Sequence, residues 1–188
     1  METVTSIKQP KITDKNFIAK FTREDGKVCY RANLFDQVGE IENYVPLLHV
    51  LNTAKPGEIV EIMINSPGGF VTTGVRIMQA IYNCKADVYT VGVGPCMSIA
   101  ACIWGAGKYR KMMEPLGSLM IHMPSSQIGG KTLDIAQECH STNAYFSGVI
   151  RLLFKDILTE EEMSEVIDQR KDKYFNAKYV NEKLGGVK

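Results

Sequence analysis

The feature that most constrains this fold is the alternation of apolar strand-like runs and helical patterns between residues 59 and 122. The runs "IVEIMIN" (59–65) and "DVYTVGV" (87–93) are rich in β-branched residues, and a helical repeat of apolar side chains follows each of them. A third run, "SLMIH" (118–122), comes next. Strands that alternate with helices form βαβ units around a mainly parallel sheet, so the sequence predicts an α/β fold.

The flanking sequence predicts the remaining elements from turn and capping signals. They are a hairpin with Gly26 in its turn, a helical run that begins irregularly or at Pro46, a long helix over about 132–158, a helix opened by a capping box at Thr159 and Glu162, and a last helix between Asn176 and Gly185.

Length and composition indicate one globular domain. The chain has 188 residues, of which 45% are hydrophobic and 23% charged, and these values suit a single folded core. The polar residues 1–15 are expected to form a flexible N-terminal segment, and residues 16–188 to form the domain.

Charge and cysteine usage exclude several functions. A net charge of +1 gives no case for nucleic acid or an anionic membrane as a partner. The longest apolar run, "SIAACIWGAG", is too short to span a bilayer, and the N-terminus lacks the apolar stretch of a signal peptide. Five scattered cysteines without metal-ligand spacing predict reduced thiols in a cytoplasmic protein that has no metal site.

Two strand-to-helix corners predict a site. Ligands bind beyond the carboxyl ends of parallel strands, and "NSPGG" and "GPCMS" follow two successive strands there. Gly68 and Gly69 allow the backbone to approach a substrate, and free N–H groups at helix starts can stabilise an oxyanion. Ser98 would lie beside these donors. A serine at a helix start is more often only a helix cap, and a Pro-Gly-Gly turn is usually only a turn.

His122 at the end of the third strand changes that balance. A serine hydroxyl needs a neighbouring base to act as a nucleophile, and His122 is the one histidine expected at this edge of the sheet. His49 and His140 fall within helical runs and are expected to be surface or packing residues. For the third member, Asp168 and Asp172 both lie in "VIDQRKDKYF", four residues apart, and either could face the site if the segment is helical.

Four motifs in the same order resemble the ClpP family of serine peptidases. They are "INSPGG", "GPCMSIAA" with a serine at the nucleophile position, "MIHMP" with its histidine, and "KDKYFNA" with its aspartate, and the resemblance runs from about Ile59 to Gly185. It implies a ClpP/crotonase-like spiral of βαβ units with a protruding handle helix.

The resemblance also implies the site residues. Ser98 would be the nucleophile, His122 the general base and Asp172, rather than Asp168, the acid. The non-catalytic alternative is that Asp172 is only a solvated surface charge beside Lys171 and Lys173. The backbone N–H groups of Gly69 and Ile99 would form the oxyanion hole, and no cofactor is needed.

The family implies a serine endopeptidase that cuts peptides or unfolded protein segments inside a homo-oligomer of stacked heptameric rings. The apolar surplus of the long helix favours such an interface independently. The family also implies an AAA+ unfoldase partner. Residues 1 to about 45 match the housekeeping pattern poorly, which argues against this docking and favours a stand-alone or phage-type relative.

Two other functions compete with this one. An acyl-CoA-processing crotonase shares the fold, but the histidine and aspartate motifs have no role in it. A catalytically silent ring subunit is the non-enzymatic alternative, and the intact set of motifs argues against it.

Overall fold

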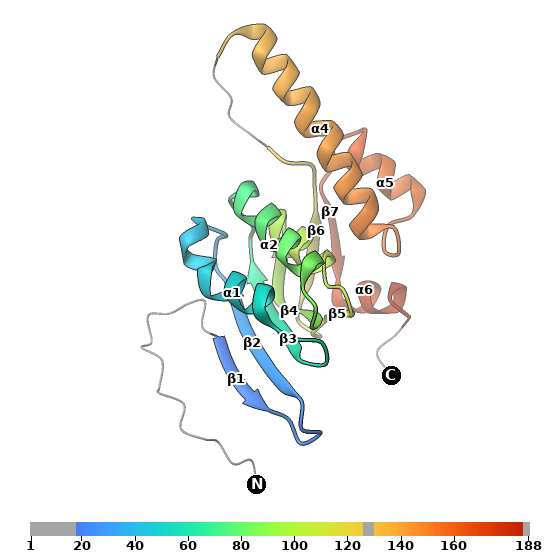
Figure 1. Ribbon diagram of the computed structural model, residues 1–188. Coiled ribbons are helices and arrows are strands. Elements are labelled where there is room, and N and C mark those ends of the chain that lie inside the picture. Colours follow the sequence, from blue (N-terminus) through green and yellow to red (C-terminus); the bar gives the residue numbers. More distant parts are fainter. Residues whose placement is uncertain (1–17, 126–129, 186–188) are drawn as a thin grey trace.

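The computed structural model describes residues 18–125 and 130–185 (Figure 1). Its centre is a seven-stranded sheet in the order β1-β2-β3-β4-β6-β7, and β5 pairs with the first half of β4. The strands are β1 (Ile18–Thr22), β2 (Val28–Phe35), β3 (Ile59–Ser66), β4 (Asp87–Met97), β5 (Arg110–Met113), β6 (Ser118–Ile121) and β7 (Lys173–Asn176). All pairs from β2 to β6 are parallel, whereas β1 and β7 add antiparallel edges, so the predicted α/β fold is confirmed.

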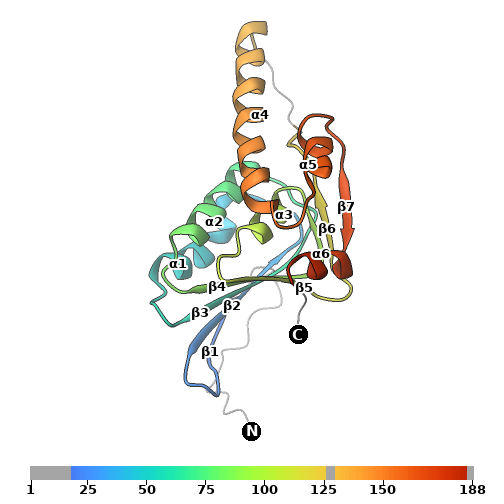
Figure 2. The same cartoon turned by 90° about the vertical axis from the view of Figure 1, so that its right-hand side faces the viewer.

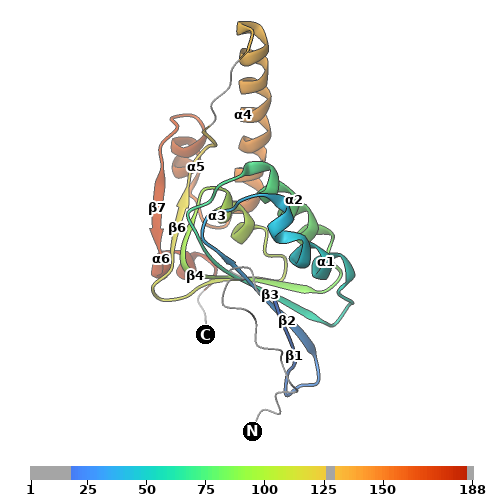
Figure 3. The same ribbon diagram turned by 90° about the vertical axis from the view of Figure 1, so that its left-hand side faces the viewer.

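Three helices cover one face of this sheet (Figures 2 and 3). They are α1 (Val45–Thr53), α2 (Val71–Asn83) and α3 (Ile99–Gly105), and a short 3-10 helix, η1 (Ile41–Tyr44), leads into α1. Every residue of α3 is buried, so α3 is enclosed by the elements around it. The remaining helices are α4 (Thr132–Phe154), α5 (Glu160–Ile167) and α6 (Ala177–Lys183).

Three contacts fix α3 and therefore the residue that precedes it. The fully buried Trp104 donates from Nε1 to the Met112 carbonyl at 2.9 Å, and its own carbonyl accepts from Thr90 Oγ1 at 2.7 Å. On the other side, Gly74 of α2 lets Ile99 pack tightly, because a Cβ at Gly74 would lie 2.1 Å from Ile99 Cγ1. These contacts hold the start of α3 between α2 and the end of β4.

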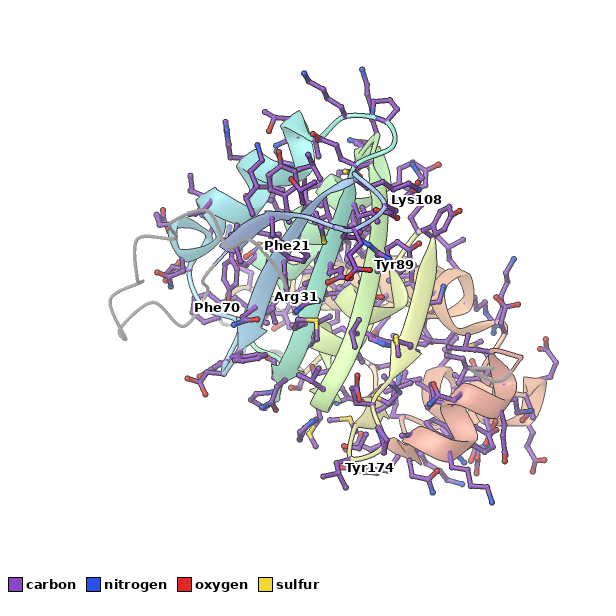
Figure 4. The ribbon with its side chains drawn as sticks, turned by 90° about the horizontal axis from the view of Figure 1, so that it is seen from below. Phe21, Arg31, Phe70, Tyr89, Lys108 and Tyr174 are labelled. Atoms are coloured by element: carbon purple, nitrogen blue, oxygen red, sulfur yellow. The ribbon has the colours of Figure 1, made fainter. Side chains whose placement is uncertain are left out.

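The opposite face of the sheet carries polar and aromatic side chains (Figure 4). Arg31 of β2 pairs in register with Glu61 of β3, which in turn pairs with Tyr89 of β4. Arg31 Nε lies 2.8 Å from Glu61 Oε2, and the guanidinium stands over the ring of Phe21 on β1. The sheet is therefore apolar toward the helices and amphipathic on the far side.

Helix α4 extends away from the body of the molecule (Figure 1). Its buried residues, Phe146, Ile150 and Phe154, all belong to its second half. Leu133 near its start is 82% exposed, and the first turns of α4 bury no residue against the rest of the described chain. Within the described ranges, no helix is both long enough and apolar enough to cross a membrane.

Several local predictions are confirmed. Gly26 turns the hairpin with φ 79°, Pro46 lies in the first turn of α1, and Thr159 and Glu162 form the capping box of α5. Asn176 caps α6, which ends before Gly185. The flexible segment predicted for residues 1–15 lies outside the described residues and stays a prediction.

The end of β4 differs from the prediction. The sequence placed a break at "GPCM", but β4 continues through these residues to Met97. The chain changes neighbours here instead, because Tyr89–Gly92 pair with β5 and Pro95–Met97 pair with β6. Gly94 permits this course, since a Cβ there would lie 2.6 Å from Asn65 Oδ1.

Candidate active site

Ser98 occupies the single residue between β4 and α3. Its backbone is in a conformation that L-residues rarely adopt, with φ 57° and ψ −128°. The Ser98 N–H donates to the Met120 carbonyl of β6 at 3.0 Å, which ties this turn to the neighbouring strand. The side chain makes no capping bond to α3 although Ser98 is at the N-cap position. Helix capping therefore does not account for its hydroxyl.

The Ser98 hydroxyl instead contacts His122. Ser98 Oγ lies 2.7 Å from His122 Nε2, which is hydrogen-bonding distance. His122 follows β6 directly, and β6 pairs in parallel with the last residues of β4. The two side chains meet because adjacent parallel strands end at the same edge of the sheet.

Asp172 lies on the other side of the imidazole. Its Oδ1 is 3.6 Å from His122 Nδ1, longer than a hydrogen bond but within ion-pair range. The pairing of Ile121 with Lys173 in the antiparallel β6–β7 ladder places these two residues opposite each other at the next step. The Asp172 side chain is 49% exposed, compared with 21% for His122.

Asp168 is directed elsewhere. It follows α5 as its C-cap residue and accepts a hydrogen bond from Ser164 Oγ at 2.9 Å. The segment around Asp172 is not helical, as one reading of the sequence supposed, but enters β7. Of the two aspartates, the structure thus brings Asp172 to His122. The other two histidines, His49 and His140, are both exposed.

The turn after β3 lies against Ser98. A Cβ on Gly68, whose φ is 95°, would lie 2.7 Å from both Met97 O and Ser98 Cβ, so only glycine fits there. The Val38 N–H donates to Gly68 O at 2.8 Å, and Val38 O accepts from the Phe70 N–H at 2.7 Å. This clamp leaves the Gly69 N–H unused by any hydrogen bond among the described residues.

The first N–H of α3 is free in the same way. No hydrogen bond in the described part of the chain uses the Ile99 N–H, as expected for a helix start. A Cβ at Gly68 would lie 3.3 Å from Ile99 N, so the backbone of the glycine turn packs directly against the start of α3. Of the two predicted donors, the Ile99 N–H directly follows Ser98, and the Gly69 N–H directly follows the glycine that lies against Ser98.

Cys96 is not an alternative nucleophile. Its side chain is fully buried, and burial raises the pKa of its thiol to about 12. The sulfur lies 3.6 Å from the Ile64 carbonyl, on the core side of β4. A thiol of this pKa stays protonated at neutral pH and is a poor nucleophile.

Two residues that shape the site were not predicted. Ser66 is fully buried and its Oγ accepts from the Gly68 N–H at 3.1 Å, which stabilises the glycine turn. Glu165 of α5 binds both Lys171 and Lys173, the neighbours of Asp172. Ser66 stands inside the "NSPGG" motif and could have been found from it, whereas Glu165 has no local sequence signal.

The sequence matches the family described as Clp protease over residues 17–183. The chain belongs to the Clp protease family. This match includes residues 17–45, which the motif resemblance had left out.

Individual relatives are distant. ATP-dependent Clp protease proteolytic subunit 1 of Corynebacterium jeikeium is 28% identical over 134 residues, which cover 71% of each chain. The chloroplastic subunit 3 of Arabidopsis thaliana is 31% identical over 118 residues, or 62% of this chain and 38% of the relative. Subunit 2 of Nocardia farcinica is 36% identical over 88 residues, or 46% and 43% of the two chains. The match thus spans less than half the length of the last two relatives.

Proposed function

We propose that this chain is a serine endopeptidase that cleaves peptides or unfolded protein segments with Ser98, His122 and Asp172. The observation that carries the proposal is the 2.7 Å contact between Ser98 Oγ and His122 Nε2, made by a serine whose side chain does not cap its helix. Membership of the Clp protease family supports the same reaction.

The first half of the reaction is acyl transfer to Ser98. Ser98 Oγ attacks the peptide carbonyl carbon while His122 Nε2 accepts the hydroxyl proton. The tetrahedral intermediate collapses when the C–N bond breaks and His122 returns that proton to the leaving amine. In the second half, a water molecule attacks the ester carbonyl carbon while His122 Nε2 accepts a proton from it, and His122 returns that proton to Ser98 Oγ as the C–O bond breaks and the acid product leaves. Asp172, beside Nδ1, favours the tautomer in which Nε2 is free to accept a proton.

The oxyanion of the tetrahedral intermediate needs two donors beside Ser98. The Gly69 and Ile99 N–H groups have no partner among the described residues, and they belong to the two strand-to-helix corners that meet where Gly68 lies against Ser98. Donors fixed in this way stabilise the charge that develops in the transition state, because they do not have to reorganise. We assign the oxyanion hole to these two groups.

A fluorophosphonate probe tests the nucleophile. We expect the wild-type protein to be labelled and to hydrolyse short peptides, and Ser98→Ala to lose both activities. Ser147→Ala is the control, because Ser147 Oγ also forms a 2.7 Å hydrogen bond, which is to the Asn143 carbonyl within α4. Labelling retained in Ser98→Ala would identify another nucleophile. An unlabelled wild-type protein would favour the silent ring subunit.

We further propose that the chain assembles into two stacked heptameric rings through α4. Leu133, Tyr145 and Leu152 of α4 are 82%, 51% and 68% exposed, a set of apolar side chains that a monomer would leave in water. Peptides would have to enter a closed chamber, so short unstructured peptides should be cut and folded proteins spared. Light scattering measures the assembly, and a monomer mass at micromolar concentration would refute it.

A further inference from the structure

The segment that carries Asp172 is held against α5. After α5 ends at Ile167, Arg170 turns the chain with φ 58°, and the Lys171 N–H donates to the Glu165 carbonyl at 3.0 Å. The chain then enters β7 at Lys173. Asp172 is therefore the one residue between a backbone anchor on α5 and the first pair of the β6–β7 ladder.

One carboxylate binds the side chains on both sides of Asp172. Glu165 Oε1 accepts from Lys171 Nζ at 3.0 Å, and Glu165 Oε2 accepts from Lys173 Nζ. The Glu165 side chain is 21% exposed and Lys173 25%, so these two groups are better shielded than Asp172 at 49%, whereas Lys171 is 55% exposed. Hydrogen bonds from Lys173 and then Lys171 lower the pKa of Glu165, so it is ionised at neutral pH.

This bridge fixes the direction in which Asp172 points. The side chains of residues 171 and 173 reach Glu165, while the side chain between them reaches His122 Nδ1. The bridge also occupies the ammonium groups of the two residues adjacent to Asp172 in the sequence. Freed lysines could draw that carboxylate away from His122 at little cost, because the His122–Asp172 contact of 3.6 Å is not a tight hydrogen bond.

We infer that Glu165 is a positioning residue of the active site, which holds Asp172 toward His122 by binding Lys171 and Lys173 together. The inference rests on the proposed peptidase function and adds to it a residue that does not touch the substrate. It predicts that Glu165 acts on turnover only through Asp172.

A double-mutant cycle tests this dependence. Glu165→Gln keeps the size of the side chain and removes its charge, and we expect kcat to fall about tenfold with KM changed less than about twofold. In the Asp172→Asn background the same change should lower kcat less than about twofold, because the acid it positions is already gone. Glu160→Gln, an equal charge change on the exposed first residue of α5, should leave kcat and KM at wild-type values.

The outcomes separate this inference from the proposed function. A wild-type protein that neither reacts with fluorophosphonate nor cuts peptides overturns both. If the wild-type protein is active and Glu165→Gln has the same kcat as Glu160→Gln, only the role of Glu165 is overturned. The same holds if Glu165→Gln lowers kcat equally with Asp172 and with Asn at position 172, because an equal loss indicates a general structural effect. If Glu165→Gln does not fold, Lys171→Gln and Lys173→Gln decide the matter. Each variant should lower kcat when Asp172 is present and not in the Asp172→Asn background. Wild-type kcat in both lysine variants would refute the positioning role of the bridge.

Discussion

The strained backbone of Ser98 predicts that a glycine variant is more stable than an alanine variant at this position, which reverses the usual order of stability. A glycine at an ordinary helical position is less stable than alanine by about 0.5–1 kcal/mol, since it loses more chain entropy on folding. A non-glycine residue held at φ 57° and ψ −128° instead carries strain of about 1–3 kcal/mol. Glycine at position 98 removes this strain, so Ser98→Gly should be more stable than Ser98→Ala by about 0.5–2 kcal/mol.

Urea unfolding of the two variants measures this difference. Both lose the same hydroxyl and the same contact with His122, so their difference reports the backbone conformation together with one methyl group. Protomer concentrations must match, because assembly adds to apparent stability. Ser164→Gly and Ser164→Ala in α5 are the control pair, which also lose one hydroxyl each and should show the ordinary order, with alanine more stable. If Ser98→Ala is as stable as Ser98→Gly, the strained turn does not exist in solution.

Three further predictions concern the acid, the thiols and the long helix. Asp172→Asn should lower kcat by orders of magnitude while Asp168→Asn stays near wild type in peptide hydrolysis, and the reverse order would move the acid to Asp168. A thiol reagent at pH 8 should modify the exposed Cys139 quickly and Cys96 only after denaturation, because burial raises the pKa of Cys96 to about 12 and keeps its thiol protonated. Rapid modification of the folded Cys139→Ser variant would contradict this prediction. Leu133→Asp should reduce the assembled mass in light scattering, since it places a charge in the proposed interface, and an unchanged mass would exclude Leu133 from that interface.

The parts of the site that were predictable lie at the ends of strands with strong local patterns. Ser98 and His122 follow apolar runs that favour parallel strands, and such strands end at one edge of a sheet whatever the rest of the chain does. Their contact could therefore be expected from order and spacing. The positive φ of Ser98 could not, because no local sequence signal marks it and the contacts around it, such as that of Ile99 with Gly74, are long-range.

The strand β7 was missed for a different reason. "KYFN" is a short segment after two lysines, and it becomes a strand because β6 offers an edge for pairing. The glycine and proline of "GPCM" misled in the opposite direction, because a strand that changes partners keeps its extended backbone across them. In both segments a long-range pairing decided the structure, and local propensity gave no information about it.

The site has one part in the centre of the sheet and another at its β7 edge, and the two parts differ in how firmly they are held. Ser98, His122 and the glycine turn belong to the parallel centre of the sheet and are tied together by backbone hydrogen bonds through Met120 and Val38. Asp172 depends on a four-residue edge strand and on one ionic bridge to α5. A local opening of β7 would consequently displace Asp172, the proposed acid, while the contact between Ser98 and His122 remained. Turnover should thus be sensitive to whatever orders the segment from α5 to β7, and fluorophosphonate labelling should be less sensitive than peptide hydrolysis, because it needs no proton donation to a leaving amine.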